Sequence, residues 1–286
     1  MKKEEVCNFV KRLFFRITRD DFFGTASEMS YMFALGIFPF MTFVVAVFGW
    51  LGKRSQIDSI VTFFKNIVPN DVVNLIMGVV KEVLIFENGG IMAVVGLLVT
   101  IFLAANAIAV IIKGLNKAYN VEEKRSFIHT RLLAVLMVLA NALVAFLSVN
   151  LIIFGKVILN YIFLYTNIEP YWIKFFSIIR WPLAFFALYF MSALNYYVLP
   201  SVTGPEALKR RSVRVGSLFF CVFWLLGSAT FSTYINNLNT YNKVYGTLGA
   251  FAILLVWLFY TSLIILIGGE LNSQNYKKLL VEKEDN

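Results

Sequence analysis

Long apolar stretches alternate along this chain with shorter polar connections. Six of the stretches have roughly the 20 residues that an α-helix needs to cross a bilayer, and they cover residues 30–51, 90–112, 132–154, 178–198, 213–234 and 248–267. Each is predicted to be a helix, because backbone N–H and C=O groups cannot stay unpaired in hydrocarbon. The pattern therefore predicts an all-α, polytopic membrane protein with six transmembrane helices.

The composition supports a bilayer as the solvent of this chain. Of its 286 residues, 59% are hydrophobic and 15% are charged, and the mean hydropathy is +0.74. Soluble domains carry about 25% charged residues because their surfaces face water. The first apolar stretch begins near Ser30, too late and too long for a cleavable signal peptide. The two cysteines lie far apart in the chain and provide neither a disulfide framework nor metal-ligand spacing.

The distribution of Lys and Arg predicts the orientation of the spans. The two ends and the second and fourth connections hold 18 of these residues, whereas the opposite side holds 8. Positive residues concentrate on the cytoplasmic side, so both termini are expected in the cytoplasm. The same rule explains the net charge of +9 without nucleic acid. The expected organisation is a cytoplasmic amphipathic segment (1–27), a six-helix transmembrane domain (28–275) and a cytoplasmic tail (276–286).

An amphipathic helix is predicted over residues 4–19, ahead of the first span. Its apolar positions recur at helical spacing, whereas its basic positions fall mainly on the other side: Lys11, Arg12, Arg16 and Arg19. Such a helix suits the surface of an anionic cytoplasmic leaflet. Packing against the protein's own cytoplasmic face is an equally open interpretation.

The first external connection, residues 52–89, is long enough to contain structure of its own. Its apolar spacing predicts a short helix over 57–68, which Pro69 ends, and a second over 72–86, which Asn70 or Asp71 caps. A structural lid over the spans is the favoured interpretation, and a gate is the alternative.

Catalytic and metal-binding motifs are missing from the sequence. The only histidine, His129, lies in a basic connection, and no hydrolase, zinc-protease or phosphate-loop motif is present. We therefore expect no enzymatic activity, no cofactor, no metal and no nucleic-acid partner.

Polar residues within or beside the spans are the candidate functional residues, because hydrocarbon makes them costly unless they face a partner or water. The predicted topology brings several of them to the cytoplasmic half, where Lys113 and a glutamate could pair. The candidates are Glu28, Asn106, Lys113, Asn141, Asn195, Glu270 and Asn272. They predict a polar vestibule that opens inward. The alternative is that they hydrogen-bond between helices or mark the membrane interface.

Several motifs resemble the YihY/BrkB family of bacterial inner-membrane proteins, and the resemblance covers nearly the whole chain. The most specific residues are Pro39, Pro200, Tyr245, Gly246, Trp257, Gly268 and Glu270, the last two within Gly-Gly-Glu-Leu-Asn at 268–272. Gly269 departs from the alanine that is frequent in the family. The resemblance implies six spans in the bacterial cytoplasmic membrane, and proposals for the family favour transport or envelope lipid handling. Members were once labelled ribonuclease BN, but no residues here could align a phosphodiester.

Three classes of function remain after these observations. The first is a transporter or flippase-like handler of a lipid or amphiphile, with anionic membrane lipids as partners. The second is an ion or small-solute channel that forms a homo-oligomer, and the third is a non-transport scaffold for envelope assembly.

Overall fold

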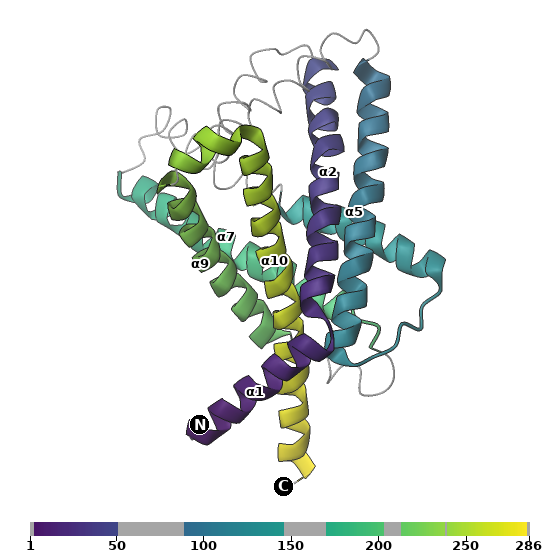
Figure 1. The fold of residues 1–286 in the computed structure, drawn as a ribbon, viewed down its shortest axis with the longest axis vertical. Coiled ribbons are helices and arrows are strands. Elements are labelled where there is room, and N and C mark those ends of the chain that lie inside the picture. The colour runs from purple at the N-terminus through teal and green to yellow at the C-terminus, as the bar shows by residue number, and fades with distance from the viewer. Residues whose placement is uncertain (1–2, 51–88, 146–169, 203–212, 238, 285–286) are drawn as a thin grey trace. The chain divides into compact units, whose positions relative to one another are not determined.

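The computed structural model describes residues 3–50, 89–145, 170–202, 213–237 and 239–284. These ranges contain seven helices and no strand, so the all-α class is confirmed for this part of the chain (Figure 1). The helices are α1 (Lys3–Arg19), α2 (Phe22–Trp50), α5 (Gly89–Tyr119), an unlabelled helix over Phe127–Ala145, α7 (Pro170–Val198), α9 (Arg214–Asn237) and α10 (Asn239–Glu284).

Each of the six predicted spans overlaps one of these helices. Within the described ranges, four segments are long and apolar enough to cross a membrane: Val94–Tyr119, Phe127–Ala145, Arg214–Phe231 and Phe251–Gln274. Pro182–Val198 is a shorter apolar helix. The count of six crossings stays a prediction. The two predicted external helices fall between residues 51 and 88, outside the described residues.

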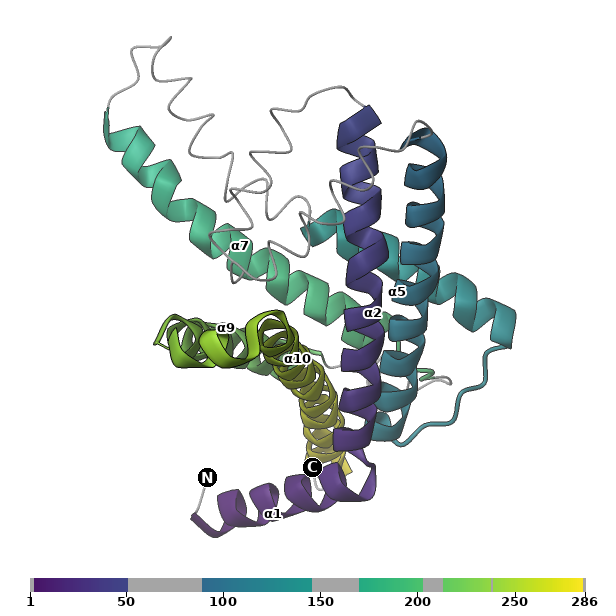
Figure 2. The same ribbon diagram turned by 45° about the horizontal axis from the view of Figure 1, so that its top comes forward.

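The contacts divide the chain into two units, and the first comprises Met1–Gly114 and Trp224–Ile264. In this unit α2 and α5 lie side by side (Figures 1 and 2). A β-carbon built on Gly96 of α5 would lie 3.1 Å from the backbone nitrogen of Phe43 on α2, so the helices approach closely there. Gly36 faces Leu103 and Glu28 faces Lys113 along the same pair. These pairings show that the two helices are antiparallel.

Asp21 joins α1 to α2 in the first unit. Its φ angle of 51° lies in the left-handed region, where the chain turns out of α1. Its carboxylate accepts a hydrogen bond from the backbone amide of Gly24 at 3.1 Å, which caps the start of α2. This cap explains why α2 begins at Phe22, well before the predicted start at residue 30.

The second unit comprises Leu115–Phe223 and Ile265–Asn286. It contains the last turn of α5, the helix Phe127–Ala145, α7, the first part of α9 and the last part of α10. Leu115, Leu199 and Leu266 are fully buried in this unit. Tyr196 on α7 donates a hydrogen bond to the backbone carbonyl of Ile265 on α10 at 2.9 Å, which joins these two helices.

The helix Phe127–Ala145 carries an exposed apolar stripe. The stripe recurs at intervals of three or four residues and therefore follows one helical face. Its members are Ile128, Leu132, Leu136, Leu139 and Leu143, each more than half exposed. Such a face is stable against lipid tails, in agreement with a membrane protein.

Candidate functional site

The motif Gly-Gly-Glu-Leu-Asn at residues 268–272 lies inside α10 and is buried. Glu270 and Asn272 are both fully inaccessible. The last span is predicted to end at residue 267, whereas the apolar segment of α10 extends to Gln274 and the helix itself to Glu284, so Glu270 lies inside the apolar segment. The last turn of α5, the first turn of α9 and α7 all pack against this stretch within the second unit. We call this stretch and the residues that contact it the α10 junction.

Two glycines allow the helices of the α10 junction to touch. A β-carbon at Gly216 of α9 would collide with the backbone carbonyl oxygen of Gly268 and with the side chain of Asn272. A β-carbon at Gly268 would collide with the Tyr196 hydroxyl and lie 3.0 Å from the Gly216 carbonyl oxygen. This is the close approach that small residues permit at membrane helix interfaces.

Asn272 caps the N-terminus of α9 from a neighbouring helix. The backbone amide of Gly216 donates a hydrogen bond to Asn272 Oδ1 at 2.6 Å. The amides of the first helical turn have no partner within their own helix. Asn272 therefore satisfies a buried donor, and its amide group is held in one orientation.

Glu270 places a carboxylate in the apolar part of α10. Gln274, one turn later, donates a hydrogen bond from Nε2 to Glu270 Oε1 at 2.9 Å. From α5, Tyr119 packs on the same stretch, because its ring edge would lie 3.8 Å from a β-carbon at Gly269. An ionisable side chain at such a position marks a functional site by default, because its burial in a membrane is costly.

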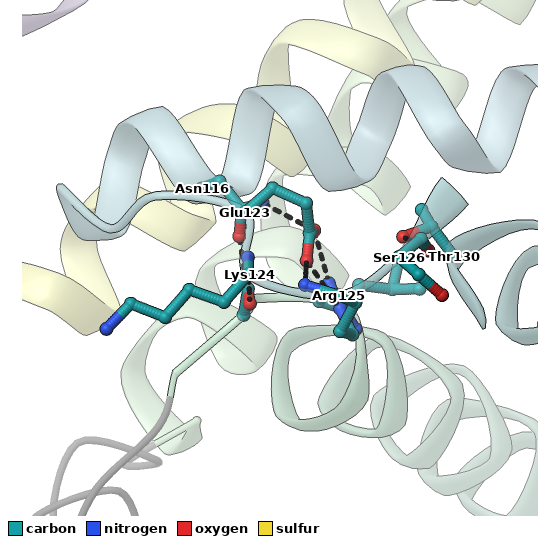
Figure 3. Close-up of polar contacts among 8 residues, drawn as sticks. Asn116, Glu123, Lys124, Arg125, Ser126 and Thr130 are labelled. Atoms are coloured by element: carbon teal, nitrogen blue, oxygen red, sulfur yellow. Dashed lines mark hydrogen bonds and ion pairs between the residues drawn. The ribbon is translucent and has the colours of Figure 1, made fainter. Parts of the chain in front are cut away.

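A second polar cluster connects the end of α5 to the segment after α7. We call it the loop network, and its members are Asn116, Glu123, Arg125, Leu199 and Ser201. Figure 3 labels Asn116, Glu123 and Arg125 among them. Asn116 donates from Nδ2 to Glu123 Oε2 at 2.9 Å, and its Oδ1 accepts from the backbone amide of Ser201 at 2.7 Å. The Asn116 side chain thereby joins Glu123, which precedes the helix Phe127–Ala145 in the sequence, to Ser201, which follows α7.

The geometry of the α5 terminus places Asn116 for this role. Asn120 adopts a φ angle of 54°, and the amides of Asn120 and Val121 donate to the carbonyls of Lys117 and Asn116. This is a Schellman motif, which ends a helix and turns the chain away from its axis. The turn brings the following loop back over the last turn of α5.

Arg125 binds Glu123 in the loop network through three hydrogen bonds, one of them from its backbone amide to Oε1 at 3.0 Å. Its Nε donates to Glu123 Oε1 at 2.8 Å and its Nη2 donates to Oε2 at 2.7 Å. Nη2 also donates to the Leu199 carbonyl at 2.6 Å. The hydrogen bonds from Arg125 are the largest cause that lowers the pKa of Glu123 to about 2, and Asn116 contributes to the same shift. The carboxylate therefore stays charged at neutral pH.

Asn141 and Asn195 pair with each other between the helix Phe127–Ala145 and α7. Asn141 Nδ2 donates to Asn195 Oδ1 at 3.0 Å, and Asn195 Nδ2 donates to Asn141 Oδ1 at 2.8 Å. Asn195 also donates to the Met191 carbonyl in its own helix. This is the hydrogen bonding between helices that the sequence left open as the alternative to a vestibule.

The remaining predicted site residues lie mostly in the first unit. Lys113 Nζ and Glu28 Oε2 are 3.1 Å apart, and the two side chains are 57% and 42% exposed. Asn106 is half-buried. Trp257 meets Trp224 edge to face, with ring centroids 5.9 Å apart. The pair of Lys113 with Glu28 is therefore present, but it is an exposed ion pair and contributes little to stability.

The family-motif residues occupy different environments. Pro39 lies inside α2 and is half-buried, and Pro200 is buried beside the loop network. Tyr245 and Gly246 lie in α10, but their side chains are outside the described residues. Glu123, Arg125 and Ser201 were not among the predicted site residues. Ser201 directly follows the family-motif residue Pro200, which is the signal that could have indicated this part of the network.

Apolar helices, one with an exposed apolar stripe and one with a buried Glu-Leu-Asn motif, define an α-helical membrane protein. A model of the family described as Virulence factor BrkB matches residues 13–286. The chain belongs to this family, which confirms the resemblance to YihY/BrkB proteins.

Three relatives cover most of this chain. "Putative ribonuclease-like protein YfkH" of Bacillus subtilis (strain 168) is 26% identical over 97% of this chain and 98% of its own length. A "UPF0761 membrane protein" of Pseudoalteromonas atlantica is 25% identical over 92% of this chain and 84% of its own. A "UPF0761 membrane protein" of Psychromonas ingrahamii is 22% identical over 95% of this chain and 88% of its own length. No solved structure matches the chain.

Proposed function

We propose that this protein is a transporter in the bacterial cytoplasmic membrane, with both termini in the cytoplasm, that moves a lipid or amphiphile between leaflets. The observation that carries the proposal is the fully buried carboxylate of Glu270 within an apolar helical segment. Burying an ionisable side chain in a membrane is costly, so a carboxylate at this position is expected to have a function. Binding of a substrate or an ion is such a function.

The packing around Glu270 places it between helices. Gly216 and Gly268 bring α9 and α10 into backbone contact beside it, the close approach that small residues allow. Ionisable residues that face the interior of a membrane helix bundle mark substrate or ion pathways, which supports a transported substrate at this contact. The proposal includes no catalytic step, no nucleic-acid partner and no cofactor.

A scaffold for envelope assembly is the second candidate, and the loop network favours it. Arg125 and Glu123 pair with each other and with backbone or amide groups on separate segments. Networks that satisfy their own members rigidify a fold and need no substrate. The lipid-movement assay below separates the two candidates.

Lipid movement in proteoliposomes tests the proposal. Purified protein is reconstituted with a fluorescent, headgroup-anionic phospholipid, and a membrane-impermeant quencher reports the lipid that reaches the outer leaflet. The wild type should accelerate lipid movement above that of empty liposomes, and Glu270→Gln should lose most of this acceleration with unchanged incorporation. Glu122→Gln, which removes a carboxylate from the exposed loop, is the matched control and should behave as the wild type. A wild-type rate equal to that of empty liposomes would reject lipid transport, and an active Glu270→Gln would reject the site.

A further inference from the structure

The helix Phe127–Ala145 is the least buried of the four apolar segments in the described ranges. Of its apolar length 11% is buried in the protein, whereas the other three are between 22% and 39% buried. Its packed face carries Ala134 and Met137, which are buried, and Asn141, which pairs with Asn195 on α7. The apolar stripe of this helix lies about half a turn away from these residues and therefore faces outward.

The leucines of the apolar stripe match the depth of one leaflet. The first and last of them, Leu132 and Leu143, are 11 positions apart in the sequence. At about 1.5 Å per residue they are separated by about 17 Å along the helix. The hydrocarbon core of a bilayer is about 30 Å thick, so each leaflet contributes about half of that. One acyl chain can therefore lie along the stripe from end to end.

Basic side chains flank the apolar stripe where the helix begins. With about 3.6 residues per turn, His129 and Arg131 lie on either side of the line from Ile128 to Leu132. The Arg131 guanidinium lies over the ring of Phe127, 5.4 Å from its centroid, and this ring is 74% exposed. This cation–π contact keeps the guanidinium at the level of the first helical turn. A cation therefore lies at the end of an outward apolar surface.

The charge of this helix is positive and concentrated at its start. Residues 127–145 include no Asp, Glu or Lys, and Arg131 is the one permanently charged side chain among them. In the preceding connection, Glu123 is bound by Arg125 in the loop network. Lys124 extends away from the start of the helix at Ser126 (Figure 3). The helix surface therefore complements a partner that is anionic at one end and apolar along its length.

A phospholipid has this chemistry, whereas a second copy of the chain fits less well. Guanidinium groups bind phosphate through several N–H donors in one plane. Two copies in one membrane share their orientation, so pairing of their stripes would bring two Arg131 side chains to the same level, where like charges repel. Contacts between membrane helices also favour small residues, and the stripe consists of leucines and one isoleucine.

We propose that one anionic phospholipid binds along the outer face of the helix Phe127–Ala145, with an acyl chain on the apolar stripe and its phosphate at Arg131 and His129. The lipid comes from the leaflet in which the helix begins. Arg131 donates hydrogen bonds to the phosphate oxygens, and the leucines contact the acyl chain. This site involves neither Glu270 nor the movement of lipid between leaflets, so it is independent of the proposed transport function.

Native mass spectrometry of the full-length protein in detergent tests the headgroup contact. The protein is titrated with phosphatidylglycerol, with phosphatidylcholine of the same acyl chains, and with glycerol phosphate, which has the anionic group but no chain. The first phosphatidylglycerol should bind at least several-fold more tightly than phosphatidylcholine, and glycerol phosphate should not bind. Arg131→Gln should remove most of this preference, and Arg131→Lys should keep part of it. Lys124→Gln, which removes one positive charge from the same connection, is the matched control and should behave as the wild type.

Two results of this titration would overturn the proposal. The first is an equal loss of preference in Arg131→Gln and Lys124→Gln, because the effect would then be one of general charge. The second is binding of glycerol phosphate as tight as that of the lipid, because the apolar stripe would then contribute nothing.

Photochemical cross-linking locates the lipid without changing Arg131. The photoreactive residue p-benzoylphenylalanine is introduced in place of Leu136, on the apolar stripe, and separately in place of Leu226, an exposed leucine of α9. Both proteins are illuminated in nanodiscs that contain equal amounts of phosphatidylglycerol and phosphatidylcholine. The ratio of phosphatidylglycerol to phosphatidylcholine adducts should be at least several-fold higher at position 136. Equal ratios would show ordinary surrounding lipid, and a cross-link between two protein chains at position 136 would assign the face to a second copy; either result would overturn the proposal.

Discussion

Asn272 Oδ1 accepts the backbone amide hydrogen of Gly216, so that a side chain of α10 caps the first turn of α9 across 56 residues of sequence. Caps are normally supplied by the residue that precedes the helix. Here Val213 precedes α9, and its side chain has no hydrogen-bonding group. The cap therefore ties the start of one helix to the middle of another.

Loss of this cap should destabilise the protein. Asn272→Leu leaves the Gly216 amide buried without an acceptor and should cost about 1–2 kcal/mol. Asn272→Asp keeps an acceptor and places a negative charge at the positive end of α9, so its loss should be smaller. The measurement is the midpoint of thermal aggregation in detergent, followed by fluorescence-detected size exclusion. A midpoint for Asn272→Leu equal to that of Asn272→Asp would show that the cap contributes nothing.

Added β-carbons at the glycine contact should separate α9 from α10. Gly216→Ala and Gly268→Ala both introduce collisions with backbone or hydroxyl groups, and each should cost about 1–3 kcal/mol. Gly36→Ala is the control on α2, because its β-carbon would lie 4.0 Å from Leu103 in ordinary contact. The measured quantity is the fraction of monodisperse protein that survives heating. The prediction fails if Gly36→Ala is as unstable as the other two variants.

Acid should weaken the loop network through Glu123. Its pKa falls from an ordinary value of 4.5 to about 2 in the folded protein. A depressed folded pKa contributes stability that is present above the unfolded value and is lost as the pH falls from about 4.5 towards about 2. Glu123→Gln should therefore lower stability at pH 7 and flatten its decline below pH 4.5, measured by thermal midpoints at several pH values. Glu122→Gln should retain the wild-type decline, and a Glu123→Gln profile parallel to the wild type would contradict the assignment.

The N-terminal helix α1 should bind anionic membranes. Phe14 and Phe15 are 68% and 65% exposed, whereas Ile17 is buried. Basic residues near an anionic leaflet contribute about 1 kcal/mol each, and salt screens them. A peptide of residues 1–21 should bind anionic vesicles and become helical there. Its helicity should be lower in high salt and on neutral vesicles. It should also be lower when the four basic residues are changed to Gln: Lys11, Arg12, Arg16 and Arg19. A peptide indifferent to anionic vesicles would assign α1 to intramolecular packing.

The predicted topology is tested by reporter fusions in bacteria. Fusions after Asn120, after Gly204 and at Asn286 should report the cytoplasm, and fusions near Asp71 and Asn239 should report the opposite side. The reason is the excess of Lys and Arg on the side of the first three sites. A cytoplasmic signal at Asp71 or Asn239 would reject the arrangement of six spans.

Hydrophobic length located the helices well but their ends poorly. The length of an apolar stretch reflects only the thickness of the membrane core, so it cannot predict where a helix begins or ends outside that core. Asp21 caps α2 before its apolar stretch, and α10 continues through polar residues to Glu284. The predicted pair of Glu28 with Lys113 was recoverable, because both residues lie at corresponding ends of adjacent antiparallel helices.

The loop network could not be predicted from the pattern. Glu123 and Arg125 lie in a charged connection, where sequence reasoning expects solvated side chains. Their pairing depends on a turn at Asn120 and on Leu199 and Ser201, which are more than 70 residues away. Hydropathy gives the depth of a residue along a span but not the direction in which it faces, so the sequence left hydrogen bonding between helices open without identifying Asn141 and Asn195 as partners.

The position of Asn116 also has a consequence for biosynthesis. Its side-chain oxygen is bound by the amide of Ser201, 85 residues later in the chain. At about 5–20 residues per second of translation, that amide leaves the ribosome about 4–17 s after Asn116 itself. The side-chain oxygen of Asn116 therefore lacks this donor until the helix Phe127–Ala145 and α7 have been made, whereas its Nδ2 can already donate to Glu123. Ser201 closes the link between the end of α5 and the segment after α7.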